Sequence, residues 1–309
     1  MLRFCFPDPS LSLPERKEKL IDMFDGFLKS DILRDLFLLL GVDQQTFAKT
    51  YNCRQTAKGT VRELQVLKPY AALEECRREL YQILYELGMF SINKPRFPEN
   101  SHIIVLGGSL NACYVRSRCA AKWVDRSTRS VDGLTCYRPI NPVERKNTAL
   151  ASISDTEYGA MCDSFSKVFD LSPSDGGEEF LSDRNLNGIS CIKTFSCTRD
   201  EPTYRIWAAP STQPELRRAD TGDCLLFYLE RAEIEPKSTL LAITHNRYCN
   251  RQFVQIAYQL IKEDISVNLD VIGCLSDKEI TTMEEYDPLL YLQEIIGLLD
   301  WIERFKLEL

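Results

Sequence analysis

Residues 102–109 read HIIVLGGS, and this stretch decides the fold. A short, largely apolar run rich in Ile and Val is typical of a buried strand. The two glycines that end the run allow the backbone to bend sharply. A helix is expected after Ser109, up to about Val124. The stretch therefore predicts a strand, a tight turn and a helix, which together form the first unit of an α/β fold.

The rest of the chain repeats this alternation of apolar strands and amphipathic segments. The ranges predicted as strands are 133–137, 189–198, 204–209, 239–244 and 267–272, and those predicted as helices are 156–169, 221–231, 251–261 and 288–305. The two middle strands, 189–198 and 204–209, are expected to pair as a hairpin. Residues 172–187, rich in Ser, Asp, Gly and Asn, are expected to form an exposed loop. Residues 101–309 are thus predicted to be one α/β domain, a Rossmann-like parallel sheet flanked by helices.

The first hundred residues are predicted to form an N-terminal helical subdomain. Helices are expected over residues 13–28, 31–40 and 69–87. Ser12 and Glu15 have the spacing of a capping box, and Gly41 is placed to end the second helix. Pro95 and Pro98 then interrupt the helical pattern. We expect these helices to pack onto the rest of the chain, because their apolar stripes need a partner.

Composition narrows the class of protein. The 309 residues carry a formal charge of −7, which disfavours a nucleic-acid-binding surface. No apolar run is long enough to span a membrane, and the first residues lack the features of a signal peptide. Twelve cysteines occur without any Cys-x-x-Cys pair, so buried free thiols are expected and no metal site. We therefore expect a cytoplasmic protein with no membrane and no nucleic-acid partner.

Polar residues follow four of the predicted strands, and ligands of parallel sheets bind beyond the carboxyl ends of strands. The first group is Gly107, Gly108, Ser109 and Asn111. It is either a tight turn or a site for a phosphate or carboxylate at the start of a helix. Arg116, farther along that helix, either adds charge to such a site or faces solvent.

The second group follows the predicted strand 133–137, and the third follows the predicted strand 204–209. Arg138, after the strand near residue 136, is placed to hold an anion, or else pairs with Glu144. The third group contains Ser211, Asp220 and Thr221. Asp220 is a candidate for moving a proton, and a helix cap at Asp220 or Thr221 is the simpler explanation.

The fourth group is Thr244, His245 and Arg247. An imidazole titrates near neutrality, so His245 at the end of a strand could act as a general acid or base. Alternatively, a neighbouring carbonyl satisfies the ring. We expect Thr244 and Arg247 to contact the ligand in either case.

These groups, in this order, resemble the YdcF/SanA-like family of Rossmann-like domains. The resemblance rests on residues 105–108, 219–221 and 244–247, and it covers roughly residues 102–274. It implies a ligand of the adenosine type, such as S-adenosylmethionine, or a phosphorylated small molecule. The chain departs from the family where residues 136–139 replace a Gly-Gly pair and where residues 220–223 read Asp-Thr-Gly-Asp. It looks closer to a cytosolic branch that has an Arg-Pro after the second strand and a Thr-Glu at the next helix, as at Arg138 and Thr156.

Two functions are consistent with these residues. The first is an enzyme, a hydrolase or group transferase, that acts on a nucleotide-like or otherwise anionic small molecule, with His245 or Asp220 moving a proton. The second is a nucleotide- or S-adenosylmethionine-binding sensor whose N-terminal helices engage a protein partner. An effector or toxin role has only the cysteine-rich, glycine-poor composition in its favour. No Gly-x-Ser-x-Gly motif is present, which disfavours an ordinary esterase.

Overall fold

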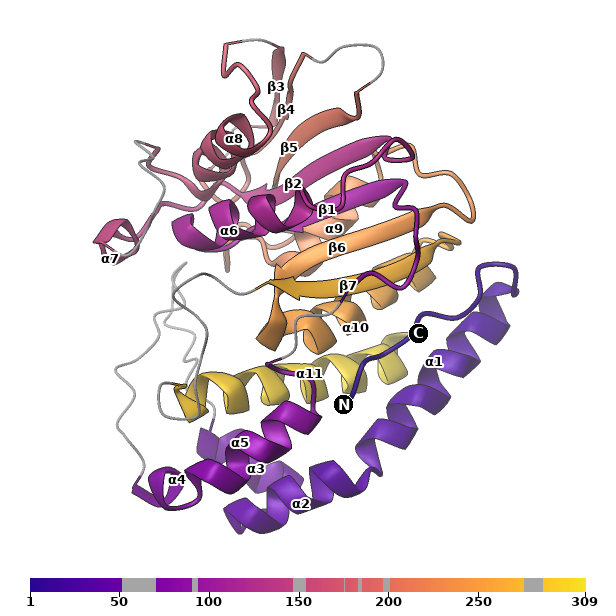
Figure 1. Cartoon of the computed structure of the whole chain (residues 1–309), viewed down its shortest axis with the longest axis vertical. Helices are drawn as coiled ribbons and strands as arrows, with labels where there is room; N and C mark the ends of the chain where they lie inside the picture. Colours follow the sequence, from indigo (N-terminus) through magenta and orange to yellow (C-terminus); the bar gives the residue numbers. More distant parts are fainter. Residues whose placement is uncertain are drawn as a thin grey trace.

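A computed structural model describes residues 1–51, 71–90, 94–146, 154–174, 176–182, 185–196, 201–274 and 286–309. Seven strands form one sheet in the order β3-β4-β5-β2-β1-β6-β7 (Figure 1). Five of them run parallel: β1 (His102–Leu106), β2 (Ser130–Cys136), β5 (Thr203–Ala209), β6 (Thr239–His245) and β7 (Asn268–Cys274). The antiparallel strands β3 (Gly177–Ser182) and β4 (Ser190–Thr194) complete one edge. The fold is therefore α/β and Rossmann-like, as the sequence predicts.

The order of the strands reverses beside β1. The chain first builds outward from β1 to β2 and β5, and it then crosses back to place β6 on the other side of β1. A reversal of this kind separates the loops of the two neighbouring strands at their carboxyl ends. The switch point of this sheet accordingly lies between β1 and β6.

Helices cover both faces of the sheet. On one face α6 (Leu110–Ala120) and α8 (Glu157–Val168) pack together over a core that includes Val105 and Phe165. On the other face lie α9 (Thr221–Leu229) and α10 (Cys249–Lys262), and α11 (Pro288–Glu308) packs against α10 (Figure 1). The short helix α7 (Pro142–Lys146) follows β2, and a single 3₁₀ turn, Asn246–Tyr248, follows β6. Among the helices that the structure describes, none has the length and apolar character needed to cross a lipid bilayer.

The N-terminal helices form a further layer outside α10 and α11 (Figure 1). They are α1 (Leu13–Leu28), α2 (Asp31–Leu40), α3 (Gln44–Tyr51), α4 (Ala71–Glu75) and α5 (Arg77–Glu86). The Phe24 ring lies 5.1 Å from that of Phe305 in α11, and the Phe4 ring lies 5.7 Å from that of Phe253 in α10. The apolar stripes of residues 1–51 and 71–90 thus share one continuous core with α10 and α11.

Most predicted elements are present, and their ends follow local rules. The side chain of Glu15 accepts a hydrogen bond from the Ser12 N–H at 2.9 Å, and Gly41 ends α2 with a left-handed φ of 64°. The third predicted helix is divided at Cys76 into α4 and α5, and residues 69–70 lie outside the described part. The prediction of a loop over residues 172–187 is wrong where β3 forms. This edge strand is largely exposed and carries no apolar alternation, so the sequence gives no signal of a strand there.

A buried polar network ties the amino-terminal halves of the strands. Asp132 in β2 has no solvent exposure. Its Oδ1 accepts hydrogen bonds from Arg205 Nε at 2.7 Å and Trp207 Nε1 at 2.8 Å, and its Oδ2 accepts one from Ser130 Oγ at 2.6 Å. Ser130 Oγ also lies 3.0 Å from His102 Nδ1. The Tyr228 hydroxyl of α9 also donates to Asp132 Oδ2, at 3.3 Å, so the network fixes neighbouring strands to one another and to this helix.

Candidate functional site

The turn after β1 contains two glycines, and the neighbours of Gly107 leave no room for a side chain there. A Cβ on Gly107 would lie 2.2 Å from Glu157 Oε1 and 2.8 Å from the Leu134 carbonyl oxygen. The Gly107 N–H donates to that same carbonyl at 2.7 Å. Ser109 caps α6, since its Oγ accepts from the Ala112 N–H at 3.3 Å. The predicted tight turn is therefore present, and the atoms that approach Gly107 most closely are those of Glu157 and Leu134.

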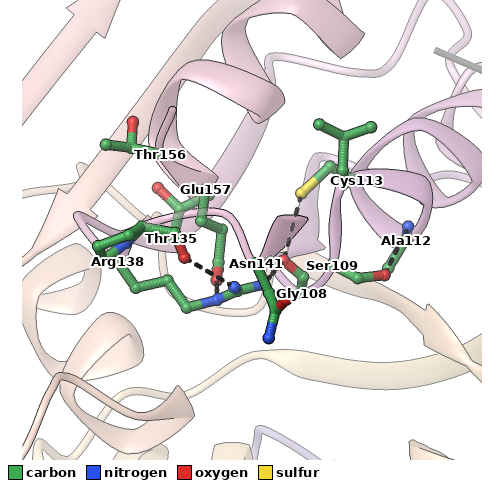
Figure 2. Close-up of polar contacts among 12 residues, drawn as sticks. Gly108, Ser109, Ala112, Cys113, Thr135, Arg138, Asn141, Thr156 and Glu157 are labelled. Carbon is green, nitrogen blue, oxygen red and sulfur yellow. Dashed lines mark hydrogen bonds and ion pairs between the residues drawn. The ribbon is translucent and has the colours of Figure 1, made fainter. Parts of the chain in front are cut away.

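Arg138 lies beside this turn and next to Glu157 (Figure 2), and it pairs with two carboxylates, those of Glu157 and Glu144. Its Nη1 donates to Glu144 Oε1 at 2.8 Å, its Nε donates to Glu157 Oε2 at 2.5 Å, and its Nη2 donates to the Gly108 carbonyl oxygen at 2.5 Å. Burial acts to lower the pKa of Arg138, but the carboxylates of Glu157 and Glu144 outweigh it and raise the pKa. Arg138 is thus a fully charged guanidinium, and its pairing with Glu144 is the alternative that the sequence analysis left open.

Glu144 brings a negative charge to the start of α6. Its Oε2 accepts a hydrogen bond from the Leu110 N–H at 3.0 Å while its Oε1 binds Arg138. The first N–H groups of a helix have no partner within the helix and favour a negative charge. We call Arg138, Glu144, Glu157 and the turn 107–110 the Arg138 cluster. The Arg138 cluster therefore already holds an anion, which is the carboxylate of Glu144.

Arg116 fills the switch point next to the Arg138 cluster. Its guanidinium donates from Nε to His245 Nδ1 at 3.0 Å and from Nη1 to the carbonyl oxygens of Leu106 at 2.7 Å and Gly107 at 2.5 Å. The residue is only 2% exposed, so the alternative of a solvent-facing Arg116 is wrong. The side chain links the end of β1 to the end of β6.

His245 is buried at this link. Because its Nδ1 accepts from Arg116, the neutral ring carries its proton on Nε2. The thiol of Cys274 lies 3.9 Å from the same Nδ1. Nδ1 is therefore committed within the protein, and any proton transfer by His245 has to use Nε2.

Asp220 and its neighbours organise the start of α9. Asp220 is the N-cap, and its Oδ1 accepts from the N–H groups of Gly222 at 2.8 Å and Asp223 at 3.2 Å. Thr221 is the first residue of that helix, and Ser211 Oγ accepts from the Gln213 N–H at 3.0 Å. These contacts match the capping role that the sequence left open for Asp220.

Asp223 was not singled out by the sequence, yet it holds this region together. Arg217 Nη1 forms an ion pair with Asp223, and Thr212 Oγ1 donates to Asp223 Oδ1 at 2.7 Å. Burial acts to raise the pKa of Asp223, but the hydrogen bonds from Arg217, the Asp220 N–H and Thr212 more than offset it, so the pKa is lowered. The local signal was Asp-x-x-Asp, which has the spacing of a capping box.

The remaining predicted residues have separate environments. Arg247 donates to the Tyr248 hydroxyl at 2.8 Å, and Asn111 is half-buried in the first turn of α6. Thr244 is fully buried, and its Oγ1 has no hydrogen-bond partner among the residues that the structure describes. The fold thus brings Gly107, Gly108 and Ser109 together with Arg138, while Asp220 lies with α9 on the other face of the sheet.

Glu157 is a member of the Arg138 cluster that the sequence prediction did not name as a site residue. It follows the N-cap Thr156 (Figure 2). Thr156 Oγ1 accepts from the Gly159 N–H at 3.1 Å, and Glu157 is 6% exposed. Asp155, one residue before this cap, pairs with Arg145. The Thr-Glu pair at a helix start was the available signal. Over the described ranges, no group of three His, Cys, Asp or Glu residues is arranged to hold a metal ion.

A comparison of the chain with models of known families, with curated proteins and with solved structures finds no match.

Proposed function

We propose that this chain is a cytoplasmic protein that binds a small anionic ligand at the Arg138 cluster and acts on it by hydrolysis or group transfer. The ligand is of the phosphorylated-metabolite or nucleotide class. Cytoplasmic placement is supported by the cysteines of the described segments, all ten of which are free thiols. We also propose that the chain is a divergent relative of the YdcF/SanA-like family, whose Rossmann-like fold it shares in outline.

The position of Glu144 is the observation that carries this proposal. Its carboxylate accepts from the Leu110 N–H and from Arg138, and these are the two kinds of donor that hold phosphates in proteins. With Glu157 also bound to Arg138, one positive charge faces two negative charges. An incoming anion would therefore replace Glu144 rather than add to it. Glu144 lies on α7, a helix of five residues, so its displacement would disturb little packing.

The same residues favour a phosphate over an adenosine group. In dinucleotide-binding sheets an acidic residue near the end of the second strand holds the ribose hydroxyls. Here β2 ends at Cys136 and continues through Tyr137 to Arg138. The space between β1 and β6 is taken by the Arg116 guanidinium. We therefore propose a phosphorylated small molecule ahead of S-adenosylmethionine.

A second candidate function is a sensor that binds the same ligand without converting it. It is favoured by the engagement of both proposed proton carriers, His245 Nδ1 by Arg116 and Asp220 Oδ1 by the start of α9. Exposed side chains on the N-terminal helices, Leu38 at 71% and Tyr85 at 47%, would then be available to a protein partner. The two functions share one binding site and differ only in turnover.

The test is a thermal-unfolding panel of phosphate, phosphorylated metabolites, nucleotides and S-adenosylmethionine on the full chain and two variants. Glu144→Gln removes the competing charge, so it should bind the stabilising anion about tenfold more tightly. Arg138→Gln should abolish the stabilisation. Glu263→Gln, an exposed position at the end of α10, is the matched control and should behave as the parent chain.

Mass spectrometry of each stabilising compound after incubation separates the two functions. Conversion of the compound establishes an enzyme, and stabilisation without conversion establishes the sensor. Equal affinity of the parent chain and Glu144→Gln would mean that the anion binds elsewhere. That result would overturn the proposed site.

A further inference from the structure

Two cysteine side chains meet on the face of the sheet that α6 and α8 cover. Cys119 lies in the last turn of α6, and Cys274 is the last residue of β7. The helix packs against this strand, and both cysteines are free thiols in the apolar core of that face. The Cys274 thiol donates a hydrogen bond to the Cys119 sulfur. Two thiols that are far apart in the sequence are therefore in contact.

The Cys274 thiol also touches the end of β6. Its Sγ lies 3.0 Å from the Thr244 carbonyl oxygen and 3.9 Å from His245 Nδ1. Cys274 is 4% exposed and Cys119 is 9% exposed. The pair thus lies beside the link between Arg116 and His245, and Cys119 is the more accessible of its two members.

The two thiols differ in acidity. The hydrogen bond from Cys274 lowers the pKa of Cys119; burial opposes this effect, and the charge of Lys122 adds to it. The same hydrogen bond raises the pKa of Cys274, and burial raises it further. The thiolate is the form of cysteine that reacts with oxidants. Cys119 is therefore the sulfur that reacts first, while Cys274 keeps its proton.

Other buried thiols of the described chain have different partners. Those of Cys113, Cys224 and Cys249 donate to backbone carbonyl oxygens. Burial raises the pKa of Cys113, which lies on the same helix as Cys119, to about 12. Cys113 is consequently a matched control for the pair.

We propose that Cys119 and Cys274 are a site of reversible oxidation, at which a peroxide converts the two thiols into one disulfide bond. The Cys119 thiolate attacks an oxygen of the peroxide, the O–O bond breaks, and Cys119 becomes a sulfenic acid. The hydroxide that leaves takes up the proton that Cys119 had released.

The Cys274 thiol then attacks the Cys119 sulfur. An S–S bond forms, the S–O bond breaks, and the second hydroxide leaves as water with the proton of Cys274. The two sulfurs lose two electrons, and the peroxide gains them. The disulfide ties α6 to β7 beside the switch point, and a dithiol reductant restores both thiols. This modification does not require the ligand proposed for the Arg138 cluster.

The test treats the native full chain with hydrogen peroxide at pH 7, blocks the remaining thiols and maps the peptides by mass spectrometry. We expect a peptide that links Cys119 to Cys274, and dithiothreitol should remove it. The chain has twelve cysteines, so the same treatment after unfolding in urea is the control. The link should be at least about tenfold more abundant in the folded chain, because the fold holds the two sulfurs together.

Three variants assign the two roles. Cys119→Ser should leave Cys274 as a thiol after the same treatment. Cys274→Ser should stop the reaction at the sulfenic acid of Cys119, which dimedone traps. Cys113→Ser should keep the link.

The parent chain decides the matter even if a variant does not fold. Equal yields of the link in folded and unfolded chains would overturn the proposal. A folded chain in which peroxide oxidises other cysteines while Cys119 and Cys274 remain thiols would overturn it as well.

Discussion

Arg116 Nε donates a hydrogen bond to His245 Nδ1 at 3.0 Å, across the point where the strand order of the sheet reverses. The same guanidinium donates to the carbonyl oxygens of Leu106 and Gly107. These three partners are neutral acceptors at the carboxyl ends of β1 and β6. The side chain therefore acts as an internal brace between the two halves of the sheet.

Replacing Arg116 should destabilise the fold strongly. Arg116→Met keeps most of the apolar stem but leaves buried acceptors on Leu106, Gly107 and His245 without their donor. We expect the free energy of unfolding to fall by about 2–4 kcal/mol, as measured by urea denaturation at pH 7. Arg118→Met, on the exposed side of the same helix, is the control and should cost less than about 0.5 kcal/mol. Equal effects of the two variants would contradict the bracing role.

The network around Asp132 leads to a second prediction. Asp132→Asn removes the charge that the buried side chain of Trp207 and the guanidinium of Arg205 both contact. Removing one partner of a buried ion pair typically costs about 3–5 kcal/mol, because the other charge remains buried. Since Arg205 is 22% exposed, we expect the lower end, about 3 kcal/mol, in urea denaturation. A loss below about 1 kcal/mol would show that water satisfies Arg205.

The third prediction concerns pH and Asp223. Its pKa is lower in the folded chain than the ordinary value of 3.8, so the ionised form stabilises the fold. This contribution is present above about pH 4 and is lost as the pH falls through the folded-state pKa. Asp223→Asn should therefore cost about 2 kcal/mol at pH 7, and the cost should shrink as the pH falls below 3.8. Urea denaturation of parent and variant at pH 7, 5 and 3 measures it, and a cost that grows toward acid pH would refute the prediction.

Thiol reactivity provides a fourth prediction. Burial raises the pKa of Cys113, Cys136 and Cys249 to about 12, whereas Cys5 is exposed. At pH 8 the three buried thiols hold roughly one thiolate in ten thousand, and the thiolate is the reactive form. An aromatic disulfide reagent at pH 8 should label Cys5 within minutes and the other three only after unfolding. Peptide mapping by mass spectrometry reads the labels, and early labelling of Cys113 would show that α6 opens readily.

Much of the fold follows from local sequence patterns. Residues 102–106 form a strand over the predicted range because a short apolar run ended by glycines has few alternatives. The capping box at Ser12 and the glycine at position 41 set helix ends through contacts within a few residues. The strand β3 escaped prediction because edge strands need no buried face, and its pairing partner β4 supplies the hydrogen bonds.

The candidate site was predicted only in outline. The sequence placed Gly107, Gly108 and Arg138 near one another, because each follows a parallel strand and such ends lie on one edge. It left open whether Arg138 pairs with Glu144, and it did not identify Glu157 as a third member. Ion pairs depend on distances between segments that have no periodic signature in the chain.

The sequence by itself determined the α/β class, the alternation of strands and helices, and the groups of polar residues at strand ends. These properties arise from periodicity, capping and glycine conformation, which act over a few neighbouring residues. Only the tertiary structure decided the strand order, the burial of Arg116 against His245 and the placement of Glu144 at the start of α6. Those features depend on which segments meet after the chain has crossed from one side of β1 to the other. Side chains that are far apart in the sequence then lie close enough to satisfy each other's charges and hydrogen bonds.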